Sequence, residues 1–376
     1  MSTSQGSPED QRRTTPPSSF VDPPLTPPPT EEKAFIQAAR VLQLFQARKA
    51  GRPVGRVPWT RFQLVPGEYD EIRTQIERNE SLHGYIRNKI RYDYDARSLQ
   101  LIVRMPTAVH ELFVAGVEDA ILSQLKAIRD GSGNGAEFAR RVQPARSTVI
   151  YLPVEGSLGN ARSKHEPDAS FWHSNAQYPG VVIEVAYSQM RKNLSRLAEG
   201  YLLDSDASIQ VVIGLDVEYG NTNSRKATLS TWRTQIFHTG DGDELGVVQP
   251  IENEAFRDDQ GNPTNHPGLR LRLKDFAYEE LSRSNIGNDD REIVVSAQQL
   301  CQYLAEAESR AQGQELLGKH TIPSGIRKRK RSETPAEEVD SGDEARFHEQ
   351  EQKAAKRAAI NDPDYETIST KSGSSD

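Results

Sequence analysis

The sequence predicts a mixed α/β or α+β domain that spans roughly residues 60–315. The first observation is a change of period: apolar residues recur every three or four positions in some segments and alternate with polar residues in others. The second is a pair of almost continuously apolar segments, residues 181–187 and 209–217, which are typical of central strands in a covered sheet. The third is a segment with helical spacing, residues 190–203, between those two strands.

Composition excludes several classes of protein. A hydrophobic fraction of 35% in 376 residues indicates that part of the chain does not fold. The sequence has no apolar run of 18 residues and no apolar segment near its start, so we expect no membrane-spanning helix, no secretory signal and no membrane partner. A single cysteine, Cys301, excludes a disulfide framework and a cysteine-based zinc site. The net charge of −7 argues against a uniformly basic nucleic-acid coat protein, but permits a local basic patch.

Both ends of the chain have the composition of disordered segments. Residues 1–30 contain eight of the 22 prolines, and residues 318–376 contain few large apolar side chains. Such segments bury too little apolar surface to offset the entropy lost on ordering. We therefore predict disordered tails at 1–30 and 318–376, a helical extension at 31–84 and a folded domain at 85–317.

The N-terminal half carries helical and strand patterns in succession. Thr30, followed by two glutamates, suits the start of a helix. Alternating polar and apolar residues on either side of the polar turn at 95–98 indicate a hairpin, which Pro106 ends. The predicted helices are residues 31–49, 67–80 and 108–128, the predicted strands are 90–94 and 99–105, and the glycine-rich residues 131–135 are a predicted loop.

The C-terminal half alternates strands with helices. The predicted strands are residues 148–154, 169–172, 181–187, 209–217, 228–237 and 269–273. We expect the strand at 228–237 to lie at an edge of the sheet. Helices are predicted at residues 190–203 and 296–317.

Two carboxylates carry the clearest chemical signal. Asp168 follows Pro167 and precedes a short strand. After fifteen intervening residues, Glu184 lies inside the apolar strand 181–187. A glutamate in such a strand is costly to bury without a partner. If adjacent strands bring the two carboxylates together, a divalent cation relieves their repulsion, and oxygen ligands suit Mg²⁺ or Mn²⁺. A cation of this kind polarises a phosphodiester and helps to generate hydroxide.

This arrangement resembles the PD-(D/E)XK, or restriction-endonuclease-like, nuclease superfamily, whose signature is Pro-Asp, a spacer, and Glu-x-Lys on a strand. The similarity covers about residues 85–280. It includes a hairpin that ends at Met105-Pro106, a following helix that opens with His110-Glu111, Tyr201 in the helix after the glutamate strand, and the late segment His266-Pro267-Gly268-Leu269-Arg270-Leu271. The resemblance implies a mixed β-sheet flanked by helices and an endonuclease-like, metal-dependent DNA phosphodiesterase. It also implies that Asp168 and Glu184 bind the metal and that Glu111, a further acidic group, belongs to the same metal site.

One position departs from the family signature. Alanine stands at 186, where the family has lysine. Glu184, Ala186 and Ser188 share one face of a strand, so no side chain at 186 can polarise the phosphate. Lys192, at the start of the next helix, is the cation that we predict in its place.

Simpler structural roles compete with each assignment. Asp168 is in a context where aspartate is often a turn or cap residue. Glu184 could form a buried salt bridge in a degenerate fold, with Arg191 or Arg196 as its partner. Glu111 lies where a carboxylate is favoured by the helix dipole alone.

A basic run near the C-terminus indicates nuclear import. Five consecutive basic residues follow Ile326: Arg327, Lys328, Arg329, Lys330 and Arg331. We expect this run to bind an import receptor and to give a nuclear location, and a solvated charge run is the simpler alternative.

The sequence therefore favours a metal-dependent DNA phosphodiesterase acting in the nucleus. The alternative is a catalytically inactive nuclease-fold module that binds DNA or a protein partner, which Ala186 and the overall acidity favour. A third possibility is an interaction protein that works through its tails. Substrate strand type and oligomeric state are left open.

Overall fold

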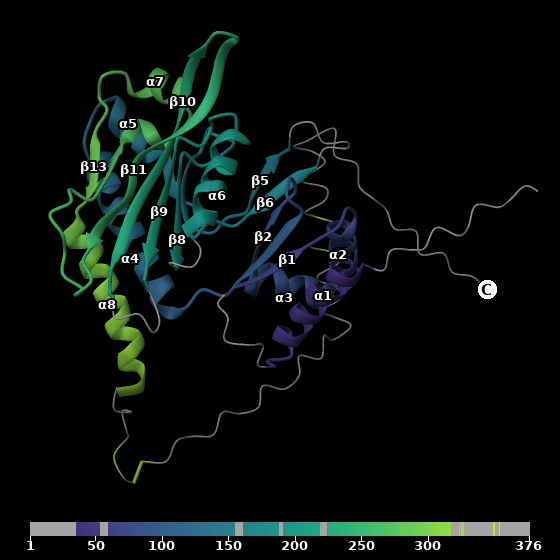
Figure 1. Ribbon diagram of the computed structural model, residues 1–376. Helices are drawn as coiled ribbons and strands as arrows, with labels where there is room; N and C mark the ends of the chain where they lie inside the picture. Colours follow the sequence, from purple (N-terminus) through teal and green to yellow (C-terminus); the bar gives the residue numbers. More distant parts are fainter. Residues whose placement is uncertain are drawn as a thin grey trace, which may run out of the picture. The chain divides into compact units, whose positions relative to one another are not determined.

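The computed structural model describes residues 35–52, 59–154, 161–187, 191–218 and 224–316, with five isolated positions, Pro323, Gly325, Ile326, Glu349 and Lys353. The helices and strands lie in one compact unit that ends at Leu317 (Figure 1). They form a mixed α+β fold, which confirms the predicted fold class. The predicted tails at 1–30 and 318–376 lie outside the described residues, apart from those five positions.

A six-stranded mixed sheet forms the centre of the fold. Its strand order is β11-β10-β9-β8-β7-β4, in which β8 and β9 are parallel and the other pairs are antiparallel. The two strands predicted to be central, β8 and β9, occupy the middle of this sheet. Its strands are β4 (Val142–Pro144), β7 (Ala169–His173), β8 (Val181–Tyr187), β9 (Val211–Val217), β10 (Ala227–Thr239) and β11 (Gly242–Arg257).

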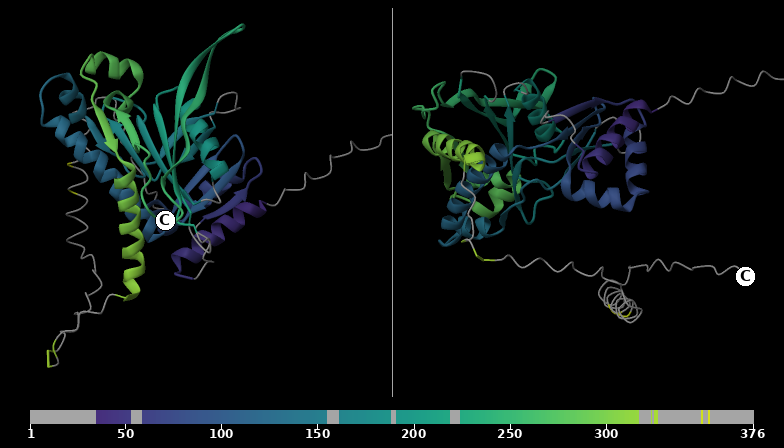
Figure 2. Two further views of the ribbon diagram at one scale, coloured as in Figure 1. Left: turned by 60° about the vertical axis from the view of Figure 1, so that its left-hand side comes forward. Right: turned by 90° about the horizontal axis from the view of Figure 1, so that it is seen from below.

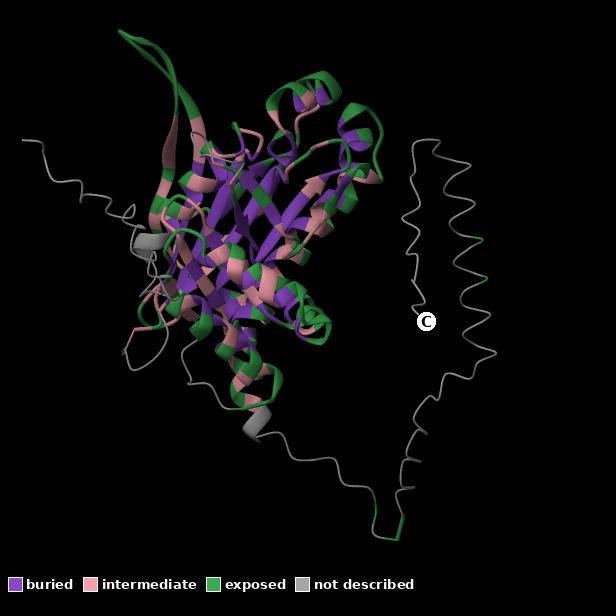
Figure 3. Ribbon diagram, turned by 90° about the vertical axis from the view of Figure 1, so that its right-hand side faces the viewer, coloured by how far each residue is buried: buried purple, intermediate pink, exposed green. Residues whose placement is uncertain are grey.

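Helices cover both faces of this sheet because its central strands are apolar on both faces (Figures 2 and 3). Alternate residues of β8 face opposite sides: Ile183 packs in the core with α4 (Ala108–Arg129) and α8 (Ala297–Leu316), and Val182 packs with α6 (Arg191–Leu203). The smaller elements on the α4 and α8 side are α5 (Asn134–Arg140), β12 (Leu269–Arg272), η2 (Leu273–Phe276), α7 (Glu279–Ile286) and β13 (Glu292–Val295).

A second, antiparallel sheet has the strand order β1-β3-β2-β6-β5. The apolar side chains of β2 and β3 pack against three helices and form a separate core. The opposite faces of β1, β2 and β3 carry mostly polar and charged side chains. The strands are β1 (Trp59–Gln63), β2 (Arg91–Asp95), β3 (Gln100–Arg104), β5 (Ile150–Pro153) and β6 (Arg162–His165), and the helices are α1 (Ile36–Lys49), α2 (Glu68–Glu77) and α3 (Glu80–Lys89).

The structure corrects four details of the sequence interpretation. The strand expected at an edge, β10, lies inside the sheet because β11 pairs along its outer side. Sequence patterns missed β11, whose outer part is solvent-exposed and therefore shows no alternation. They also missed α3, which Asn79 caps, because Gly84 weakens its helical sequence pattern. They missed α5 as well, which begins inside the predicted glycine-rich loop and is capped by Asp289.

The carboxylate of Glu68 holds the helical layer of the second sheet together. Glu68 is buried, and it accepts hydrogen bonds from the backbone N–H groups of Gln37 (2.7 Å), Ala38 (3.1 Å) and Val65 (2.9 Å). It thus satisfies two N–H groups that the first turn of α1 leaves without intrahelical partners.

We expect Glu68→Ala to lower the free energy of unfolding by about 2 kcal/mol, because three backbone N–H groups lose their buried acceptor. Urea unfolding followed by circular dichroism measures the change. Glu77→Ala, which removes an exposed carboxylate paired with Arg73 in the same helix, is the matched control and should cost less than about 0.5 kcal/mol. Equal losses in the two variants would contradict this role for Glu68.

Candidate functional site

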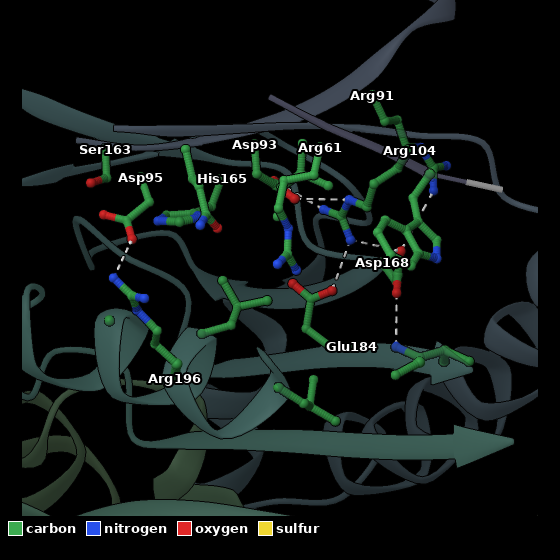
Figure 4. Close-up of a pocket in the computed structure, with 18 of the residues that line it drawn as sticks. Arg61, Arg91, Asp93, Asp95, Arg104, Ser163, His165, Asp168, Glu184 and Arg196 are labelled. Atoms are coloured by element: carbon green, nitrogen blue, oxygen red, sulfur yellow. Dashed lines mark hydrogen bonds and ion pairs between the residues drawn. The ribbon is translucent and has the colours of Figure 1, made fainter. Parts of the chain in front are cut away.

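A cavity of about 440 Å³ lies where the polar face of the second sheet meets β8 and α6 (Figure 4). Side chains of β1, β2, β3 and β6 line one side of it, and β8 and α6 line the other. The lining includes both carboxylates that the sequence singles out, Asp168 and Glu184. It is also rich in arginine, with Arg61, Arg91, Arg97, Arg104 and Arg196.

Asp168 and Glu184 meet because β7 and β8 are antiparallel neighbours. Ala169 pairs with Ile183, which places the residue before β7 beside Glu184 on the next strand. The two carboxylates contact the same atom, Nη1 of Arg104, at 3.3 Å from Asp168 Oδ1 and 2.9 Å from Glu184 Oε2. The second oxygen of Asp168 accepts a hydrogen bond from the backbone N–H of Val185 at 2.7 Å. The predicted carboxylate pair is therefore formed by the fold.

The cation between these carboxylates is Arg104, which the sequence analysis did not identify. Its Nη2 donates to Asp93 Oδ1 at 3.1 Å and to the backbone carbonyl of Glu166, and its Nε lies 2.9 Å from Asp93 Oδ2. The guanidinium is thus bound by three carboxylates, from β2, from β8 and from the residue before β7 (Figure 4). Arg196, one of the two partners considered for Glu184, pairs with Asp95 instead, and the side chain of Arg191 lies outside the described residues.

The start of α4 provides a second group of charges beside Asp168. Thr107 caps this helix by accepting from the N–H of His110, which lies in its first turn. His110 Nε2 lies 3.1 Å from Asp168 Oδ2, and Arg91 Nη1 lies 3.0 Å from Glu111 Oε1 and 4.0 Å from Asp168 Oδ1. Glu111 is therefore linked to the site through Arg91 and His110, on the edge of the carboxylate pair.

Tyr201 and Gly214 complete the surroundings of Glu184. Tyr201 is fully buried on α6, and its hydroxyl donates to Glu184 Oε1 at 2.8 Å. Gly214 lies opposite Glu184 on β9, and a Cβ there would come within 2.5 Å of Leu194 on α6. The glycine thus allows α6 to approach the sheet closely enough for Tyr201 to reach the carboxylate.

The two carboxylates have opposite pKa shifts because their partners differ. Burial raises the pKa of Glu184 above its usual range, Arg104 opposes that change, and the charge of Asp168 adds to it. Burial also works against ionised Asp168, but the charges of His110 and Arg104 outweigh burial and lower its pKa. Burial disfavours charged His110 as well, yet the Asp168 carboxylate prevails and raises the pKa of His110 to about 9. His110 and Asp168 therefore form an ion pair at neutral pH.

The sequence analysis also pointed to position 186, to Lys192 and to the basic run 327–331. Ala186 is buried and lines the cavity, so a methyl group stands where the sequence resemblance would place a lysine. Lys192 lies in the first turn of α6, but its side chain is outside the described residues, as is the basic run 327–331. Within the described part of the chain, no group of three or more His, Cys, Asp or Glu side chains is arranged to hold a metal ion.

No family model matches the chain, and no curated protein matches its sequence at a significant level.

Among the helices that the structure describes, none combines the length and the apolar character needed to cross a membrane.

Removal of the Arg104 guanidinium should destabilise the protein strongly. We expect Arg104→Met to lower the free energy of unfolding by about 3–5 kcal/mol, because it leaves three neighbouring buried carboxylates without their shared cation. Urea unfolding measures the loss. Arg270→Met, which breaks an exposed pair with Glu292, should cost less than about 1 kcal/mol. A loss in the Arg104 variant as small as in this control would refute the role of the guanidinium.

The His110 imidazole should titrate well above its usual range. We expect NMR of the ring protons, assigned with His110→Gln, to give a pKa near 9 in the folded protein. Because this value exceeds the unfolded value of 6.5, protonated His110 stabilises the fold fully below about pH 6.5. That contribution is lost as the pH rises through 9, so His110→Gln should be less stable than the native chain at pH 6 but not at pH 10. A ring that titrates near 6.5 would contradict the ion pair.

Proposed function

We propose that the protein is a metal-dependent phosphodiesterase that cleaves DNA, with its centre at Asp168 and Glu184. The observation that carries this proposal is the meeting of two buried carboxylates from adjacent strands on a single cationic nitrogen inside a cavity. Burying such a pair in an apolar sheet is costly, and carboxylates with shifted pKa values in a cavity are typical of functional sites. The mixed sheet flanked by helices agrees with the fold that the sequence resemblance implies.

The donor set fits a hard divalent cation. Carboxylate oxygens are the ligands that Mg²⁺ and Mn²⁺ prefer, and the contacts to Arg104 Nη1 mark one position that both carboxylates reach. Asp168 and Glu184 would hold the metal, and when bound it supplies polarisation of the phosphodiester and a water of lowered pKa. Tyr201 and the Val185 N–H orient the carboxylates through their remaining oxygens.

The surrounding charges support further roles in the same proposal. Glu111 and His110 lie beside Asp168, where they hold its orientation through the contacts at the start of α4. Lys192 is retained as the proposed source of positive charge from α6. The basic run 327–331, with an import receptor as its partner, supports a nuclear location and hence DNA as the substrate.

A second candidate function is a catalytically inactive module that binds DNA or a protein partner. Arg104 favours it, because its guanidinium already neutralises the carboxylates that a metal would need. Ala186 favours it too, since the strand lacks the cation that would stabilise the reacting phosphate. The two candidates differ in whether a divalent cation binds at Asp168 and Glu184.

Mn²⁺ titration and DNA cleavage on the full chain separate the candidates. We expect Mn²⁺ to bind in calorimetry, and Asp168→Asn and Glu184→Gln each to lower cleavage of single-stranded and supercoiled DNA by more than about 100-fold. Glu279→Gln, an exposed carboxylate on α7 paired with Arg283, is the matched control and should retain full activity.

Circular dichroism must show that both site variants fold. Cleavage that persists in folded Asp168→Asn would contradict the assignment of Asp168 as a metal ligand. Absence of both Mn²⁺ binding and cleavage in the native chain would reject the phosphodiesterase and favour the binding module.

A further inference from the structure

The side of the cavity opposite β8 is a sheet face with the composition of a nucleic-acid-binding surface. The strand register aligns Trp59 and Arg91 on either side of Arg104, and Arg61 and Asp93 on either side of Ile102. These residues alternate with apolar side chains that point into the core beneath α1, α2 and α3. One aromatic ring and three guanidinium groups therefore share the face that lines the cavity, together with the carboxylates of Asp93 and Asp95.

Arg61 differs from the other arginines of the cavity. Arg91, Arg97, Arg104 and Arg196 each pair with a carboxylate. Arg61 has no acidic partner among the described residues; its guanidinium carbon lies 5.7 Å from the centre of the Trp59 ring. It is exposed and points into the cavity toward the side of Glu184 (Figure 4). Its charge is therefore available for an anionic group of a ligand.

The opposite side of the cavity combines apolar residues with charged ones, among them Arg196 and Glu199 of α6. Ala186 of β8 lines it together with Leu194, Leu197 and Leu203 of α6. Because position 186 carries only a methyl group, no charged side chain from that position projects between the sheet face and α6. A nucleobase in the cavity would have these apolar side chains on one side and the Trp59 ring among the residues of the other.

The depth of the carboxylate pair limits the form of the substrate. Asp168 is 6% exposed and Glu184 is 3% exposed, so a phosphodiester must enter the cavity to reach them. A volume of about 440 Å³ lies in the range of sites for single small molecules. An intact duplex is a stiff, wide cylinder that does not bend into a cavity of this size. A flexible single strand enters without that constraint.

We propose that the cavity binds single-stranded DNA, with one base against Trp59 and the adjacent phosphate on Arg61. This inference rests on the proposed phosphodiesterase, for which it names the substrate strand type. Trp59 and Arg61 are binding residues in this arrangement, while the carboxylate pair lies deeper in the same cavity. Stacking and a phosphate contact depend little on sequence, so we infer binding with weak sequence preference.

Fluorescence anisotropy with a labelled oligothymidylate and a hairpin duplex of equal length tests the proposal. The full chain is used in EDTA, so that binding is measured without cleavage. We expect at least about tenfold tighter binding to the single strand. Arg61→Ala should weaken it about tenfold and lower the salt dependence by about one phosphate contact, and Trp59→Ala should weaken it by about five- to tenfold.

Arg270→Ala, an exposed arginine on β12 outside the cavity, is the control and should leave binding unchanged. Tighter binding to the duplex, or unchanged binding in both cavity variants, would overturn this inference even if the protein cleaves DNA. Arg61-dependent binding without any metal-dependent cleavage would instead reject the phosphodiesterase and leave a single-strand-binding module.

Discussion

The structure of the site depends on the guanidinium of Arg104. Without it, Asp93, Asp168 and Glu184 would place three carboxylates around one small volume of low dielectric, where like charges repel strongly. Its planar fork of donors reaches all three at once, which a lysine ammonium on a flexible stem could not do with the same geometry. Because Arg104 belongs to β3 and two of its partners belong to the β7–β8 pair, the same ion network joins the two sheets.

The contacts of Arg104 also distinguish the two candidate functions, a metal-dependent enzyme and a binding module. The position between Asp168 and Glu184 suits a cation, and it is held by an internal one. A metal-dependent enzyme requires the guanidinium to leave the carboxylates, whereas a binding module requires it to stay. His110, Tyr201 and the Val185 N–H keep the carboxylates oriented in either case, since each bonds to an oxygen.

The N-terminal layer is part of the site. Helices α1 to α3 support one face of the second sheet, with α1 and α2 joined through Glu68, and the opposite face lines the cavity. The strand β1 lies within residues 31–84 and pairs with β3, so Trp59 and Arg61 are carried to the cavity by sheet pairing. The long β10–β11 hairpin, which projects beyond the sheet in Figure 2, has exposed apolar residues but lines no part of the cavity.

The sequence by itself determined the mixed fold class, the central strands β8 and β9, the long helix α4 and the carboxylates Asp168 and Glu184. These features have local signals: a continuous apolar run, a helical stripe, and a charged residue where burial is expensive. Tertiary structure alone decided that Arg104 would meet Glu184, that Tyr201 would donate to it, and that Trp59 and Arg61 would face the cavity. Periodicity shows which face of a strand is polar. The pairing of strands that lie far apart in the sequence decides which site that polar face lines. The sequence analysis missed the strand β11 and the short helix α5 for a related reason. Pairing with β10 defines β11 and a cap from Asp289 defines the start of α5, and neither interaction shows in the element's own sequence pattern.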